Sequence, residues 1–179
     1  MIRLNPPLTL GEDIRKICLP QKTHDEPNVW YGKGVNLVGY GAIDSDRTNP
    51  LRTAKLDIVE TSYCIDQHNI GKWLQKVGPK IRRNLPGNPM IKANQLCGID
   101  DGVRTDVHGS CPGDSGSPAI RKNHRNEAYE QVAVVHGSVG SCRADIFPTV
   151  FTRLDDPNIF QFVNKHLNGN EPLIMTMYK

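Results

Sequence analysis

The sequence predicts an all-β fold that ends in one α-helix. Its 16 glycines and 13 prolines recur as regular punctuation, and the stretches between them are short and rich in strand-forming residues. Parallel strands would need a dozen or more helical residues between them, and the chain shows no such alternation. Short strands at this spacing form either a closed antiparallel barrel or a sandwich. We expect strands at residues 35–38, 55–59, 129–136 and 149–153.

The expected helix lies near the C-terminus. Asp155 or Asp156 can accept hydrogen bonds from its first amides, Pro157 suits its first turn and Gly169 can end it. The tail, residues 170–179, has no usable periodicity. The helix is predicted from an apolar stripe with basic residues in the last turn, namely Ile159, Phe160, Phe162, Val163 and Leu167 with Lys165 and His166.

Composition and charge exclude several classes of protein. The chain has 179 residues, 22 Lys+Arg against 19 Asp+Glu, a net charge of +3 and 37% hydrophobic residues, which fits a globular chain with its own core. The longest aliphatic cluster, residues 132–135, is far shorter than the roughly 18 to 20 apolar residues that cross a bilayer, so we expect no membrane-spanning segment. Two prolines and an asparagine interrupt residues 1–7, so this segment lacks the apolar core of a signal peptide. Any signal peptide is expected upstream of this chain.

Residues 66–93 differ in composition from their surroundings. They hold six basic residues and one acidic residue, a local net charge of +5, which leaves −2 for the rest of the chain. Residues 70–77 could form a short amphipathic helix, and the prolines after them favour a loop. Two interpretations remain open: a solvated surface loop, or a binding site for an acidic protein or a polyanion such as heparin. Nucleic acid is not an expected partner because no aromatic stacking platform accompanies the charge.

The five cysteines are dispersed along the chain. No C-x-x-C pair occurs, which argues against a zinc ribbon or a thioredoxin-type site, and we expect neither a metal site nor a cofactor. Dispersed cysteines allow disulfides, which are typical of oxidising compartments. Because five is odd, at least one cysteine is free or pairs outside this chain. The cysteines are Cys18, Cys64, Cys97, Cys111 and Cys142.

The strongest chemical signal is the loop 111–118, Cys-Pro-Gly-Asp-Ser-Gly-Ser-Pro. Glycines on both sides of Ser115 suit a tight turn that gathers backbone N–H groups and one hydroxyl in a concave site. Acyl transfer needs such donors, and removing one of them raises the barrier by about 2.7 to 4 kcal/mol. The alternative is an ordinary turn, because Gly-Asp-Ser-Gly is itself rich in turn-forming residues.

Six motifs occur in an order that resembles the trypsin-like (chymotrypsin-fold) serine peptidases over roughly residues 2–167. The resemblance implies a chymotrypsin-like antiparallel barrel, mostly the second of that family's two barrels. It divides the chain into a partial peptidase domain, 1–168, and a tail, 169–179. Within the domain it implies an inter-barrel connection at 1–24, a barrel at 25–154 with the basic insertion 66–93, and a helix at 155–168. The motifs are Ile17-Cys18-Leu19-Pro20, Val38-Gly39-Tyr40-Gly41, Leu51 to Cys64, Leu96-Cys97-Gly98, Cys111 to Pro118, and Pro148 to Arg153.

The resemblance implies a role for each residue of the nucleophile loop. Ser115 would be the nucleophile of a serine endopeptidase that forms an acyl-enzyme, and the N–H groups of Gly113 and Ser115 would form its oxyanion hole. Asp114 resembles the family's buried aspartate, which pairs with a new α-amino group after zymogen cleavage. A buried carboxylate needs such a partner because an unpaired one is costly to desolvate.

The resemblance also implies how the cysteines pair. Cys64 would bond to Cys97 and Cys111 to Cys142. Cys18 resembles the cysteine that ties the catalytic domain to an upstream propeptide or light chain, so its partner would lie outside this chain.

Two of the three triad residues are expected upstream of Met1, because this family places the histidine first, then the aspartate, then the serine. None of His24, His68 and His108 lies in an Ala-Ala-His-Cys-like context, and His136 is expected to be structural on a barrel strand. Two hypotheses follow. The chain is the C-terminal part of a secreted serine endopeptidase that acts on proteins or peptides, or it is a non-catalytic homologue used for binding.

A substrate pocket is also implied. Gly109 stands where trypsins carry the aspartate that pairs with a substrate Arg or Lys, and a neutral floor cannot pair with a desolvated guanidinium. Thr149 replaces the usual glycine on the pocket wall and would narrow it. We therefore expect a preference for small or medium apolar side chains on the amino-terminal side of the scissile bond. The other implied pocket residues are Ser110, Pro112, Ser138, Val139 and Gly140.

Overall fold

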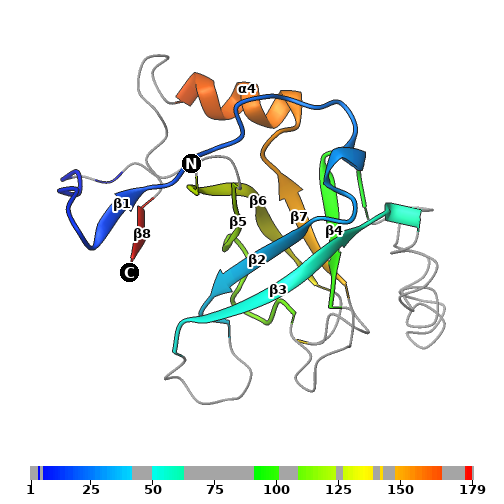
Figure 1. The fold of residues 1–179 in the computed structure, drawn as a ribbon, viewed down its shortest axis with the longest axis horizontal. Coiled ribbons are helices and arrows are strands. Elements are labelled where there is room, and N and C mark those ends of the chain that lie inside the picture. Colours follow the sequence, from blue (N-terminus) through cyan, green and yellow to red (C-terminus); the bar gives the residue numbers. More distant parts are fainter. Residues whose placement is uncertain are drawn as a thin grey trace, which may run out of the picture.

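The computed structural model describes residues 4, 6–41, 50–62, 91–100, 109–123, 127–138, 142, 148–166 and 176–178. Six antiparallel strands in these ranges close into a barrel, and a helix follows the last of them (Figure 1). This confirms the all-β fold and the C-terminal helix, and it decides for the barrel over the sandwich. Most of the basic insertion 66–93, including the helix expected at 70–77, lies outside the described residues.

The strand order around the barrel is β2-β3-β4-β7-β6-β5, and β5 closes it against β2 at the pairs Asn36↔Ile120 and Leu37↔Ala119. The four expected strands correspond to β2, β3, β6 and β7. β4 and β5 were not expected, because β4 is buried at all five positions and shows no alternation, while β5 begins with a proline. The barrel strands are β2 (Gly34–Gly39), β3 (Arg52–Val59), β4 (Gln95–Ile99), β5 (Pro118–Lys122), β6 (Tyr129–Ser138) and β7 (Thr149–Arg153).

The core fills the inside of the barrel. Along β2, and along β3 from Ala54 onward, every second residue is buried, which is the period of two that a half-buried strand requires. Burial of these side chains from water supplies the main driving force for closing the barrel. The buried cluster consists of Trp30, Val35, Leu37, Ala54, Leu56, Ile58, Leu96, Ala119, Val132, Ala133, Val135 and Phe151.

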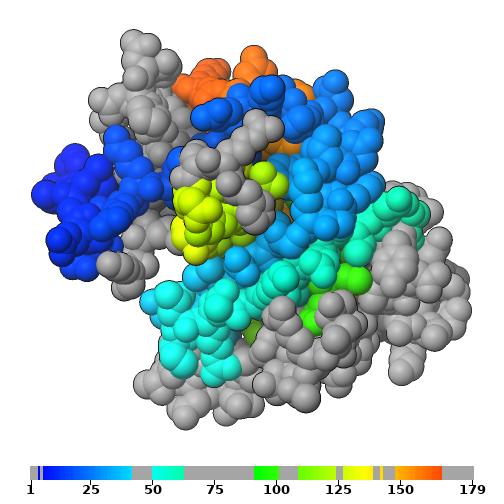
Figure 2. Space-filling model, in the orientation of Figure 1, coloured from blue at the N-terminus to red at the C-terminus, as the bar shows by residue number. Residues whose placement is uncertain are grey.

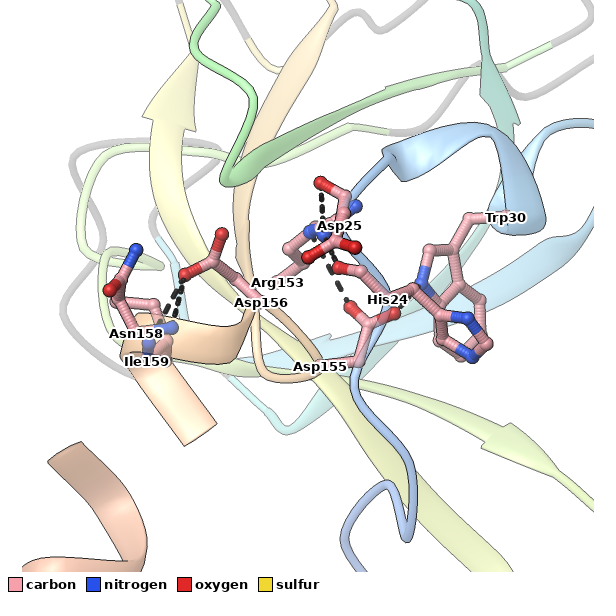
Figure 3. A network of polar contacts seen from close by, with 8 residues as sticks. All are labelled: His24, Asp25, Trp30, Arg153, Asp155, Asp156, Asn158 and Ile159. Carbon is pink, nitrogen blue, oxygen red and sulfur yellow. Dashed lines mark hydrogen bonds and ion pairs between the residues drawn. The ribbon is translucent and has the colours of Figure 1, made fainter. Parts of the chain in front are cut away.

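The segment before the barrel is held by a polar network at the end of β7 (Figure 3). Arg153 is fully buried, and its guanidinium donates to the backbone carbonyls of His24 and Asp25. The backbone amide of His24 in turn donates to the carbonyl of Asp155 at 2.9 Å. Trp30, the last residue of the short helix η1 (Pro27–Trp30), donates its indole N–H to the Asp155 carboxylate. Figure 2 shows this N-terminal segment, in blue, on the surface beside the orange helix.

The C-terminal helix is α4 (Pro157–His166), slightly shorter than the expected 155–168. Asp156 caps it, because its Oδ1 accepts hydrogen bonds from the amides of Asn158 (3.0 Å) and Ile159 (3.1 Å). None of its residues is buried, and Phe162 of the apolar stripe is 50% exposed. Within the described ranges, no helix has both the length and the apolar character needed to cross a membrane.

A second, two-stranded sheet joins β1 (Ile14–Lys16) to β8 (Thr176–Tyr178) in antiparallel register. Neither strand was expected, and β8 lies in the tail that showed no periodicity. Three residues are too few for an alternation signal, and the two partners lie at opposite ends of the sequence.

Candidate active site

The loop that carries Ser115 forms two consecutive tight turns around Asp114, just before β5. The amide of Asp114 donates to the carbonyl of Cys111 at 3.0 Å, and the carbonyl of Asp114 accepts from the amide of Ser117 at 2.9 Å. Gly113 and Gly116 have φ values of +98° and +89°, a region that favours glycine. The Gly-Asp-Ser-Gly pattern therefore presents Ser115 at an exposed apex between two glycine turns.

The loop is fixed to β6 by two backbone hydrogen bonds. The amide of Gly116 donates to the carbonyl of Val135, and the amide of Val135 donates to the carbonyl of Ser117, both at 2.9 Å. His136 follows on β6, as expected, and its side chain is exposed. These bonds bring the stretch from Val135 onward alongside the turn that holds Ser115.

The carboxylate of Asp114 is buried and joins the loop to the end of β2. Its Oδ1 accepts from the amide of Gly41 and its Oδ2 from the amide of Cys111, each at 2.8 Å. Among the residues that the structure describes, no ion pair involves Asp114. Two backbone amides thus fix the carboxylate, and a carboxylate oxygen can accept a second donor in addition to each of them.

The glycines of the Val38-Gly39-Tyr40-Gly41 motif make room for this carboxylate. A Cβ atom built on Gly39 would overlap Oδ1 of Asp114, and one built on Gly41 would overlap the whole carboxylate group. The motif is visible in the sequence, but the carboxylate that its glycines accommodate is not. The signal in the sequence was one glycine on each side of Tyr40, at the end of a strand.

A cavity of about 40 Å³ lies beside the Asp114 carboxylate, with room for more than one water-sized group. The ends of β2 and β3 and the nucleophile loop line it, including Gly39, Arg52 and Asp114. Gly109, expected at the floor of the substrate pocket, also lines this cavity. The structure therefore places Gly109 close to the buried carboxylate.

Three of the expected pocket residues are joined by hydrogen bonds. The hydroxyl of Thr149 accepts from the amide of Ser110 and donates to its Oγ, both at 3.0 Å. The hydroxyl of Ser138 donates to the carbonyl of Ser110 at 3.1 Å. Ser110 and Thr149 are buried, whereas Pro112 is exposed on the loop. Val139 and Gly140 lie outside the described residues.

A disulfide joins Cys111 in the loop to Cys142 beyond β6, which is the pairing that the resemblance implied. Cys97 in β4 is also disulfide-bonded, but its expected partner Cys64 lies outside the described residues. Cys18 is exposed and free, and its backbone bridges to β6. The upstream partner of Cys18 stays a prediction.

A protein-family model described as trypsin matches residues 1–160 of the sequence. The chain belongs to the trypsin family. Similar proteins include Melanization protease 1 of Drosophila melanogaster, 25% identical over 158 residues that cover 87% of this chain and 34% of the relative. Transmembrane protease serine 11A of Homo sapiens is 28% identical over 157 residues, 86% of this chain and 31% of the relative. Transmembrane protease serine 11G of Rattus norvegicus is 26% identical over 156 residues, with 86% and 31% covered.

The trypsin-family chain spans about a third of the length of these curated relatives. The family match confirms the resemblance drawn from the motifs.

Proposed function

We propose that this trypsin-family chain is the C-terminal part of a serine endopeptidase and that Ser115 is its nucleophile. One observation carries the proposal. Ser115 is exposed, and the amides of Gly113 and Ser115 donate to no acceptor in the described part of the chain. The oxyanion of a tetrahedral intermediate requires such N–H donors close to the hydroxyl that attacks the substrate. Gly113 and Ser115 would therefore form the oxyanion hole.

Asp114 would hold this loop in its working shape. Its two hydrogen bonds connect β2 to the loop, and the Cys111–Cys142 disulfide ties the loop to the segment after β6. In the full protein, an α-ammonium group released by cleavage would enter the cavity beside Asp114 and pair with its carboxylate. A buried carboxylate gains most from a partner of opposite charge, because the low dielectric strengthens their attraction.

The serine hydroxyl needs a base within hydrogen-bond reach and a group that orients the base. The histidine and aspartate for these roles would come from sequence upstream of Met1. The disulfide fits an oxidising compartment, and we place the complete protein in a secreted or extracellular setting.

The pocket would accept small or medium apolar side chains. The hydroxyl of Thr149 accepts from the amide of Ser110 and donates to its Oγ, so an apolar side chain against this wall does not leave the Thr149 hydroxyl unpaired. Gly109 brings no charge to pair with a substrate Arg or Lys.

Cleavage of peptides by the complete protein, expressed with its upstream sequence, tests the proposal. We expect cleavage after alanine, valine or leucine, little after arginine or lysine, and a loss of about 10⁴- to 10⁶-fold in kcat on Ser115→Ala. The isolated 179-residue chain is expected to show no hydrolysis. Cleavage confined to arginine and lysine contradicts the proposed pocket. The non-catalytic alternative predicts a different result: the complete protein would lack the upstream histidine and aspartate, and it would bind peptides without cutting them.

For the basic insertion 66–93 we propose binding to an acidic protein or a polyanion. Six basic residues against one acidic residue support this, and the attraction should weaken steeply with salt. Heparin chromatography tests this proposal. The salt concentration at which the protein elutes should fall when three basic residues of the insertion are changed to glutamine. Unchanged elution would favour a solvated loop.

A further inference from the structure

Arg52, at the start of β3, faces the same side of the sheet as the barrel core. Ala54 and Leu56 on β3 are buried, and side chains two residues apart lie on one face of a strand, so Arg52 shares their face. On β2 the inward positions include Leu37 and Gly39. Gly39 and Arg52 are cross-strand partners. The side chain of Arg52 therefore starts at the rim of the barrel interior, directly opposite Gly39.

The carboxylate of Asp114 occupies the space over Gly39, where a side chain on that residue would otherwise lie. Cross-strand neighbours on one face have Cβ atoms about 4.5 to 5.5 Å apart, which is well within the span of an arginine side chain. Arg52 and Asp114 also line the same cavity of about 40 Å³. The cavity thus lies between Arg52, which is an exposed residue, and Asp114, which is buried.

The carboxylate is suited to a second donor. Each oxygen of Asp114 accepts one backbone hydrogen bond, from Gly41 or Cys111, and a carboxylate oxygen can accept two. A guanidinium presents several N–H groups in a planar fork that matches carboxylate geometry. Within the described ranges, Arg52 is the cationic side chain that lines this cavity.

We propose that Arg52 is a built-in cation for Asp114. Its guanidinium enters the cavity, pairs with the carboxylate and stabilises the loop that carries Ser115. Arg52 would then compete with the α-ammonium group for one carboxylate and hold the loop in shape before any cleavage. This consequence rests on the function proposed above, whereas the contact between the two residues does not.

A double-mutant cycle on the 179-residue chain tests the contact. We expect Arg52→Met to lower the folding equilibrium constant about five- to tenfold when Asp114 is present, and less than twofold in an Asp114→Asn background. Lys55→Met is the matched control, because Lys55 is an exposed cation on the same strand that faces the opposite side. It should change the folding constant less than twofold in both backgrounds. Equal effects of Arg52→Met in the two backgrounds would overturn the proposal.

A local measurement keeps the test decisive if the Asp114→Asn chain does not fold. Hydrogen exchange at the amides of Gly41 and Cys111, which both donate to Asp114, should be at least fivefold faster in Arg52→Met than in the unchanged chain. Arg52→Lys should restore most of the protection. Unchanged exchange in Arg52→Met, or the same acceleration in Lys55→Met, would refute the contact. Neither measurement uses catalysis, so failure of this inference is distinguishable from failure of the proposed peptidase function.

Discussion

The indole Nε1 of Trp30 donates a hydrogen bond to Oδ2 of Asp155 at 2.8 Å, across 125 positions of sequence. Trp30 is 5% exposed and Asp155 is fully buried. The same ring packs into the barrel core and lies beneath the charged groups of Lys33 and Arg121, which are 5.3 and 5.0 Å from its centroid. This bond therefore fastens the segment before the barrel to the corner between β7 and α4.

Trp30→Phe should destabilise the fold by more than the small loss of side-chain volume alone would cause. The variant keeps an aromatic ring but leaves Oδ2 of Asp155 without its donor, which costs about 1 to 3 kcal/mol. Urea unfolding measures the loss. Hydrogen exchange at the amide of His24, which donates to the carbonyl of Asp155, should speed up as well. A loss below about 0.5 kcal/mol with unchanged exchange at His24 would contradict this role.

The pH dependence of stability should carry a contribution from Asp155. Burial raises the pKa of this carboxyl above 3.8, and the hydrogen bond from Trp30 and the charge of Arg153 offset the effect only in part. The folded chain then binds the proton more tightly than the unfolded chain does. The contribution of Asp155 to stability is therefore complete below pH 3.8 and is lost as the pH rises through the folded pKa.

Asp155→Asn removes this titration and is the comparison to make. The unfolding free energy of the unchanged chain minus that of the variant should increase as the pH is lowered from 7 toward 3.8. A difference that shrinks in acid would mean that Arg153 and Trp30 outweigh burial, and that the folded chain favours the ionised carboxylate.

Gly41→Ala should destabilise the chain by about 1 to 3 kcal/mol, because the added methyl group overlaps the Asp114 carboxylate. Gly11→Ala is the control, since nothing lies within 4 Å of a Cβ atom at that position, and it should change stability by less than about 0.5 kcal/mol. Thermal unfolding of both variants gives the comparison. Equal stabilities would mean that the carboxylate moves aside at little cost.

Thr149→Val should cost about 1 to 3 kcal/mol, although valine is close in size to threonine. It removes the acceptor of the buried Ser110 amide and the donor to the Ser110 hydroxyl. Thr149→Ser keeps the hydroxyl and should retain most of this contribution. If chemical denaturation finds valine as stable as threonine, the hydroxyl does not hold the pocket wall together.

Local composition was sufficient to predict four of the barrel strands, which are short stretches rich in strand-forming residues, and an apolar stripe was sufficient to predict the helix. β2, and β3 from Ala54 onward, bury every second residue, and such a pattern is visible in the sequence alone. β4 shows no alternation because both of its faces are buried, and the pair β1 and β8 depends on contact between the two ends of the chain. These elements follow from tertiary pairing and carry little local signal.

The same division applies to the site. The Gly-Asp-Ser-Gly loop was recognisable because its glycines serve local turns, as the positive φ values of Gly113 and Gly116 show. The choice between Asp155 and Asp156 as the helix cap was not predictable. Asp155 accepts the indole N–H of Trp30 from 125 residues away, whereas Asp156 accepts the amides of the first helical turn. The closeness of Arg52 to Asp114 likewise follows from strand register.

The central claim is that Ser115 is the nucleophile of a serine peptidase, and fluorophosphonate labelling tests it most directly. The reagent would be added to the complete protein, expressed with the sequence upstream of Met1, and the modified residue located by mass spectrometry. We predict stoichiometric labelling at Ser115, none in the Ser115→Ala variant, and none at a peptidase rate in the isolated 179-residue chain. A folded complete protein that stays unlabelled at Ser115, or that is labelled equally in the Ser115→Ala variant, would contradict the claim.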